Sequence, residues 1–206
     1  MKKSLFIALL FSTLFVYSCN HKANEPGIVD TAAISFDTSY NIDIKDFKMR
    51  DPFVFVDTIG KSYYIHANSG DNQTLTVYQS KDLKTTVEAP ILLFRASSAP
   101  WVGDITAKGV TGKVTDAPFI YRMSGAELVM IWSSFSKTTK KYAIGVAHSS
   151  SGSITGPWVQ EPTAINNDDG GHAMVFRNLD GQLKISYHSP NTYPNFVSIN
   201  NFTTNN

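Results

Sequence analysis

The sequence has little cysteine and almost no excess charge. Cys19 is the only cysteine in 206 residues, which excludes an intramolecular disulfide framework. The formal net charge is +1, which gives no broad attraction to nucleic acid or anionic membranes, so no nucleic-acid partner is expected. No P-loop, dinucleotide fingerprint, cysteine-based metal site or Gly-x-Ser-x-Gly elbow is found, and no helical periodicity is sustained after the N-terminal segment.

The N-terminus has the pattern of a targeting segment. Lys2 and Lys3 precede an apolar run, residues 5–16, that is too short to span a bilayer comfortably. The run ends at Ser18-Cys19, which resembles a bacterial lipobox. We therefore expect residues 1–19 to be a signal peptide and Cys19 to be lipidated. An ordinary signal peptide with an incidental cysteine is the alternative.

The remaining chain is expected to contain one domain. Residues 20–40 indicate a polar tether and lead-in, and residues 41–206 a single folded unit. The protein would then be exported to the periplasm or the cell surface and would contact the membrane only through its lipid. Aromatic residues make up 12% of the chain, which suits a β-rich core or a sugar-stacking surface.

A repeated pattern predicts the fold. In three segments a polar residue opens an apolar run, a glycine falls nine positions later, and a second apolar run begins within three residues. This pattern is typical of a β-hairpin whose glycine supplies a positive φ. Further strand-like runs follow, so each unit has about four strands and describes a propeller blade. The segments begin at Asp51, Asp116 and His172, and their glycines are Gly60, Gly125 and Gly181.

The expected class is therefore all-β, an incomplete propeller of three to three and a half blades. In a propeller the first strand of each blade lines the central channel. Asp51, Asp116 and His172 are then predicted to occupy equivalent positions facing the axis. The alternative is that each acid caps its own loop by bonding the local backbone.

The same residues carry a resemblance to a known family. The chain resembles glycoside hydrolase family 43, a group of five-bladed propellers, over about residues 45–192. The resemblance rests on the segments 50–53 (Arg-Asp-Pro-Phe), 114–119 (Val-Thr-Asp-Ala-Pro-Phe), 132–135 (Trp-Ser-Ser-Phe), 170–174 (Gly-Gly-His-Ala-Met) and 187–191 (Tyr-His-Ser-Pro-Asn).

The resemblance implies cleavage of arabinose- or xylose-containing polysaccharides, usually with inversion. Asp51 matches the family's general base, and Asp116 falls where the general acid stands, usually a glutamate. His172 matches a histidine that often helps to hold a water-ligated metal, commonly calcium, at the axis; no other cofactor is implied. Arg50 would orient the base or contact a sugar hydroxyl.

Two further residues are candidates for sugar contact, His188 near the end of its strand and Trp101 as a stacking platform, although a packing role for either is an alternative. A third carboxylate expected from a middle blade has no match. The segment 68–73 is interpreted as the scar of a deletion of about two blades. A shortened chain of this kind could instead be a non-catalytic surface lipoprotein that binds glycan.

Overall fold

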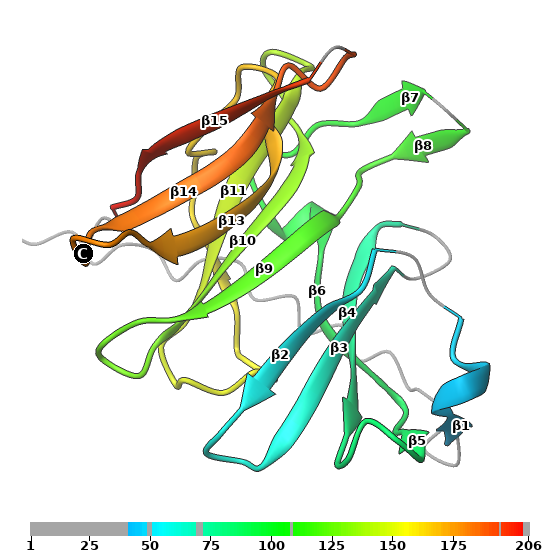
Figure 1. Ribbon diagram of the computed structural model, residues 1–206. Coiled ribbons are helices and arrows are strands. Elements are labelled where there is room, and N and C mark those ends of the chain that lie inside the picture. The colour runs from blue at the N-terminus through cyan, green and yellow to red at the C-terminus, as the bar shows by residue number, and fades with distance from the viewer. Residues whose placement is uncertain (1–40, 49–50, 69–71, 108, 194, 204–206) are drawn as a thin grey trace, which may run out of the picture.

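The computed structural model describes residues 41–48, 51–68, 72–107, 109–193 and 195–203 (Figure 1). The largest elements are three antiparallel sheets that pack against one another in chain order, and we call them the first, second and third blades. None of the helices in the described part of the chain has the length and hydropathy of a membrane span.

Each blade is an antiparallel meander, with its first strand on the inside. The first blade contains β2 (Phe53–Asp57), β3 (Ser62–Asn68), β4 (Thr74–Ser80) and β6 (Pro90–Arg95). The second contains β9 (Asp116–Arg122), β10 (Leu128–Phe135), β11 (Tyr142–Ser149) and β12 (Val159–Gln160). The third contains β13 (Gly171–Arg177), β14 (Leu183–Ser189) and β15 (Phe196–Asn201).

The smaller elements flank the blade strands. One short strand pair joins the segment before the first blade to the connection between β4 and β6, and another lies between the first and second blades. These elements are β1 (Ile42–Asp43) with β5 (Thr86–Val87), β7 (Ile105–Ala107) with β8 (Val110–Gly112), and the 3-10 turns η1 (Ile44–Asp46) and η2 (Ala96–Ser98).

The hairpins form where the repeat predicts them, but the glycines act differently. Gly181 has a φ of +78°, whereas in the other two hairpins the positive φ falls one residue later, on Lys61 (+51°) and Ala126 (+71°). The predicted role of Gly60 and Gly125 is therefore wrong. Gly60 is explained by close approach, because a Cβ there would lie 2.6 Å from Asp57 Oδ2.

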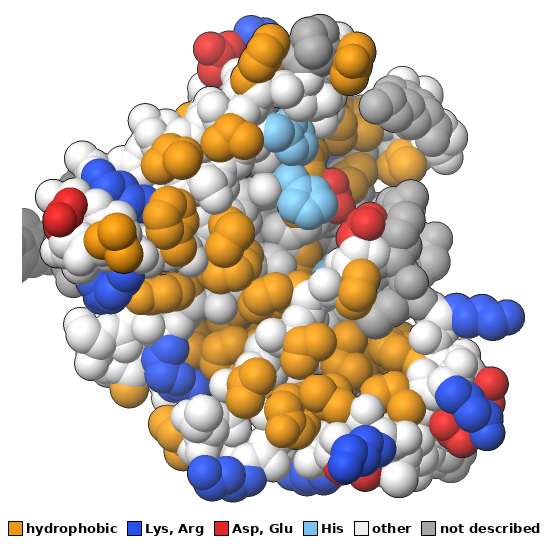
Figure 2. All heavy atoms as spheres, in the orientation of Figure 1, with side chains coloured by type: hydrophobic (Ala, Val, Ile, Leu, Met, Phe, Trp, Pro, Cys, Tyr) orange, Lys and Arg blue, Asp and Glu red, His pale blue; other side chains and the backbone are white. Residues whose placement is uncertain are grey.

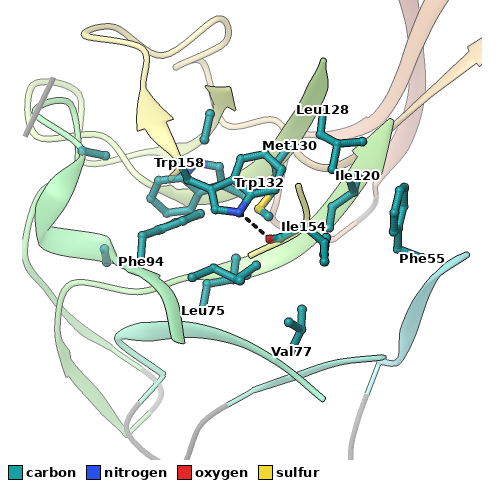
Figure 3. Packing of buried hydrophobic residues seen from close by; sticks show 14 of the residues in the cluster. Phe55, Leu75, Val77, Phe94, Ile120, Leu128, Met130, Trp132, Ile154 and Trp158 are labelled. Atoms are coloured by element: carbon teal, nitrogen blue, oxygen red, sulfur yellow. Dashed lines mark hydrogen bonds between the residues drawn. The ribbon is translucent and has the colours of Figure 1, made fainter. Parts of the chain in front are cut away.

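The second blade is covered on both faces, and this explains the unbroken apolar run 128–132 in β10. Leu128, Met130 and Trp132 of β10 pack toward the first blade (Figure 3), while Val129 and Ile131 pack toward the third. The alternation follows from the two-residue period of a strand. Within the first of these cores, Trp158 Nε1 donates to the Ile154 carbonyl at 2.8 Å (Figure 3).

The prediction of an all-β, incomplete propeller is confirmed, with three blades of which the last has three strands. The segment 68–73 falls between β3 and β4, which pair in regular antiparallel register within one blade. Its interpretation as the scar of a deletion stays a prediction.

Candidate active site

The inner strands β2, β9 and β13 run in the same direction and begin at one end of the molecule (Figure 1). At this end Figure 2 shows histidine side chains next to acidic side chains. The ring of Phe53, which opens β2, and that of Phe119, the fourth residue of β9, have centroids 5.1 Å apart. The predicted site residues of the first and second blades therefore lie on neighbouring strand ends.

Asp116 opens β9 and is held by a tyrosine. The hydroxyl of Tyr142, at the start of β11, donates to Asp116 Oδ2 at 2.5 Å. Asp116 is half-buried and Tyr142 is only 4% exposed. Burial raises the pKa of the Tyr142 phenol well above its usual value, and the charge and hydrogen bond of Asp116 add to the rise. Tyr142 is therefore a neutral, fixed donor to one carboxylate oxygen.

Tyr142 reaches Asp116 because the third blade makes room for its ring. A Cβ on Gly171 would lie 1.9 Å from Tyr142 Cε1, so only glycine fits at this position. On the same side, the ring of His188 stacks on that of Tyr142 with centroids 5.9 Å apart and an interplanar angle of 11°. Tyr142 thus joins the acid of the second blade to the histidine of the third.

A loop carboxylate supports the backbone around Tyr142. Asp169 Oδ2 accepts from the Asn191 amide at 3.1 Å, and its Oδ1 accepts from the Tyr142 amide at 3.4 Å. Asn191 Oδ1 in turn lies 3.1 Å from His188 Nε2. The network fixes His188 relative to Tyr142, and contact between His188 and a sugar stays a prediction from the sequence.

His172 lies beside this network, with its ring centroid 6.3 Å from that of His188. It is not structurally equivalent to Asp116, although the sequence predicts that it is. Asp51, Ala117 and His172 share a left-handed backbone, with φ of +52°, +46° and +54°. Across the sheet, Asp116 pairs with Ser133 and Gly171 pairs with His188, each next to a bulge. The residue equivalent to His172 is therefore Ala117, and Asp116 corresponds to Gly171. The alignment by glycine spacing is off by one residue.

Asp51 is an exposed residue separated from β2 only by Pro52. Its left-handed backbone is uncommon for a residue other than glycine, although aspartate adopts it more readily than most. In His172 the same conformation accompanies a hydrogen bond from its backbone amide to Ser133 Oγ at 2.9 Å. All three blades thus contribute to one end of the molecule.

Other predicted residues have different outcomes. Trp101 is wrong as a sugar platform, because it is 7% exposed and its ring lies 4.9 Å from that of Trp132 in the core. A Cβ on Gly145 would lie 2.0 Å from the Trp101 ring, so the tryptophan packs directly on that strand. Arg50 and Cys19 lie outside the described residues.

The donor set around His172 does not fit calcium held directly by the protein. Among the residues that the structure describes, no three His, Cys, Asp or Glu side chains come together as metal ligands. Calcium also prefers oxygen donors to imidazole. Calcium held through water at His172 stays a prediction from the sequence.

A cavity of about 440 Å³ lies elsewhere, between the second and third blades. None of the candidate site residues lines it, and it has no carboxylate that could act as an acid or base. Its lining is uncharged, with hydroxyl and amide groups from residues such as Thr163, Asn166, Tyr187 and Asn200. The chemistry is therefore assigned to the strand ends and not to this cavity.

Known proteins place the chain in a family. The family model described as "Glycosyl hydrolases family 43" matches residues 15–204. No curated protein matches the chain. A solved endo-arabinase from Bacteroides thetaiotaomicron VPI-5482 is 32% identical with a TM-score of 0.54, and the match covers 84% of this chain and 99% of that one.

Other solved relatives are longer. A thermostable family-43 glycoside hydrolase is 22% identical with a TM-score of 0.57, covering 75% of this chain and 55% of that one. An α-L-arabinofuranosidase from Lactobacillus brevis is 14% identical with a TM-score of 0.59, covering 79% and 54%. This chain thus spans about half of these two proteins and nearly all of the endo-arabinase chain. The chain belongs to glycosyl hydrolase family 43, and by that membership it is a glycosidase.

Proposed function

We propose that this chain hydrolyses glycosidic bonds in arabinose- or xylose-containing polysaccharides with inversion at the anomeric carbon. The observation that carries the proposal is the position of Asp116. Tyr142 holds its carboxylate at the start of β9, and this strand end lies next to the strand end that follows Asp51. The relative with 32% identity is an endo-arabinase, and solved neighbours include an enzyme from Xanthomonas citri complexed with xylose and with xylotriose. A pentose-containing glycan is therefore the substrate class with the most support.

In the proposed reaction the two carboxyl groups have different roles. Asp116 gives its proton to the leaving glycosidic oxygen, while Asp51 takes a proton from a water that attacks the anomeric carbon from the opposite face. Inverting enzymes of this kind need carboxyl groups roughly 6.5–9.5 Å apart, which leaves room for the water. The product sugar then carries the inverted configuration.

Tyr142 limits how Asp116 can perform its role. Since the Tyr142 hydroxyl occupies Oδ2, the transferable proton belongs on Oδ1. The buried tyrosine also fixes the rotation of the carboxyl group, which matters because aspartate is one methylene shorter than the usual glutamate. Positioning of this kind lowers the barrier by holding the acid near its target before the reaction begins.

The third blade and the termini complete the proposal. His188 and Arg50 would contact sugar hydroxyl groups, and His172 would lie near the channel axis. Export and lipidation at Cys19 would keep the enzyme at the membrane, where polysaccharide fragments from outside the cell would be met.

The test is turnover of aryl α-L-arabinofuranosides, aryl β-D-xylosides and arabinan by the full chain and its Asp51→Asn variant. Loss of one of two catalytic carboxylates should lower kcat at least ~100-fold. Asp104→Asn is the matched control, because Asp104 pairs with Lys113 at the surface and its side chain is 73% exposed. NMR of the first-formed anomer should show inversion.

Two results would contradict the proposal. If Asp51→Asn retains turnover, Asp51 is not the base. If the unmodified chain binds arabino- or xylo-oligosaccharides but cleaves none of the substrates, the alternative of a non-catalytic glycan-binding lipoprotein is correct.

A further inference from the structure

The third blade has an uncovered apolar face. Met174, Ser186 and Ile199 pair in one row across β13, β14 and β15, so their side chains share a face. Val197, opposite His188, extends the same face. Met174 is 45% exposed, Ile199 58% and Val197 77%. The opposite face, by contrast, is buried against the second blade. We call Met174, Ser186, Val197 and Ile199 the third-blade face. It is an apolar sheet surface of the kind that is buried between the other blades.

The first blade has an exposed apolar edge strand, β2, whereas Ile65 beside it in β3 is only 5% exposed. In β2, Phe55 points into the core, whereas Val54 and Val56 point away from it and are 39% and 53% exposed. Val54 pairs with the apolar Ile65, and Val56 with Tyr63. In Figure 2 hydrophobic side chains cover both the region of β2 and β3 and the region of β13 to β15 on one side of the molecule. We call Val54, Val56, Tyr63 and Ile65 the first-blade face.

Stacking of one blade on the next is how this chain already buries apolar surface. The first blade packs on the second through one core cluster, and the second packs on the third through another. The two uncovered faces are the next members of this series, one at each end of the arc. Burial of such surface contributes roughly 25 cal/mol per Å², so an arc with two open apolar faces gains by closure.

We propose that two copies of this chain close into one ring, in which the third-blade face of each copy packs on the first-blade face of the other. A two-fold axis relates the two contacts, so the assembly is closed and exposes neither face. Six blades lie within the range of four to eight that propellers adopt. We propose a second copy as the binding partner because it supplies a complementary face for both exposed faces at once.

Closure also affects the candidate active site. His188 shares its face of the third blade with Val197, and His172 is an exposed residue at the start of the same blade. The partner copy's first blade would therefore cover the open side next to both histidines. The site would then be approached along the ring axis and not from the side.

The test is sedimentation velocity of the full chain in density-matched detergent, with Ile199→Glu and Val56→Glu as variants. The unmodified chain should sediment as a dimer at micromolar concentration. Each variant buries a charge in one of the two faces and should raise the dissociation constant at least ~30-fold, as loss of an interface hot spot does. Leu179→Glu is the control, since Leu179 is fully exposed on the β13–β14 connection and outside both faces.

A mixture of the two variants separates a broken contact from a broken fold. Ile199→Glu retains its first-blade face and Val56→Glu retains its third-blade face, so the mixture can form one of the two contacts. Dimer should reappear in the mixture at a concentration where each variant alone is monomeric. The proposal is overturned if the unmodified chain is a monomer up to 100 μM, if its dimer survives Ile199→Glu, or if the mixture stays monomeric. A monomer would mean that the chain's own residues or another protein cover these faces.

Discussion

Replacing Tyr142 with phenylalanine keeps the ring over Gly171 and removes only the hydroxyl that donates to Asp116. A hydrogen bond to a charged group contributes about 1.5–3 kcal/mol to stability. Water can restore it only in part, because Tyr142 is 4% exposed and Asp116 is half-buried. We expect Tyr142→Phe to lower the free energy of unfolding by about 2 kcal/mol at pH 7.

The same hydroxyl also makes stability fall at alkaline pH. A tyrosine in the unfolded chain loses its proton near pH 10, whereas burial and the nearby Asp116 charge raise the pKa of Tyr142 in the folded protein well above that value. Between the two pKa values the folded state binds one proton more than the unfolded state. The free energy of unfolding then falls by about 1.4 kcal/mol for each pH unit. Below pH ~10 the stabilisation by the Tyr142 hydroxyl is fully present.

The difference in the free energy of unfolding between the unmodified chain and Tyr142→Phe should therefore become smaller as the pH rises. Urea unfolding followed by tryptophan fluorescence at pH 7, 9, 10 and 11 should show a difference of about 2 kcal/mol at pH 7 that shrinks once the pH exceeds ~10. Burial also raises the pKa of Tyr64, but that residue is present in both proteins and cancels. Tyr193→Phe is the control, because Tyr193 is 93% exposed. A difference that stays constant from pH 9 to 11 would refute the reasoning.

Two further predictions concern the packing at the site and the N-terminus. Gly171→Ala should displace the Tyr142 ring, lower stability by about 1–3 kcal/mol and reduce turnover, whereas Gly125→Ala, whose Cβ would meet nothing within 4 Å, should change thermal stability and turnover little. Equal effects of the two alanines would contradict the packing argument. Cys19→Ser should abolish incorporation of radiolabelled palmitate in a bacterial host and release the protein from membranes. Label retained by the serine variant would mean that Cys19 is not the lipidated residue.

The strands could be predicted because their information is local. The run from Leu128 predicts β10, and its alternating contacts with two neighbouring blades explain why residues 128–132 are all apolar. The hairpin spacing likewise locates β2, β9 and β13. What the glycine spacing could not give is which inner-strand residues are equivalent, because the positive φ of the hairpin falls on Gly181 in the third blade but on Ala126, one residue after Gly125, in the second. A count from the glycine therefore aligns Asp116 with His172, whereas the pairing across each sheet aligns Asp116 with Gly171.

The site was only partly predictable for a related reason. Tyr142 follows Asp116 by 26 residues and owes its position to Gly171 on another blade, so no short motif contains the three. One signal could have identified Tyr142. Asp116 opens the first strand of the second blade, and Tyr142 opens the third strand of the same blade. Trp101 failed in the opposite way. A tryptophan after a proline suits a sugar platform or a core equally, and its contacts with Trp132 and Gly145 are not local.

The distribution of the site over all three blades explains how a short propeller can keep it. Asp51 belongs to the first blade and Asp116 to the second, and these blades meet through Phe53 and Phe119. Tyr142 connects the second blade to His188 of the third. Both connections lie between consecutive blades of this chain and need no fourth or fifth blade. What further blades would add is cover for the two apolar end faces, which a second copy can supply by the same stacking.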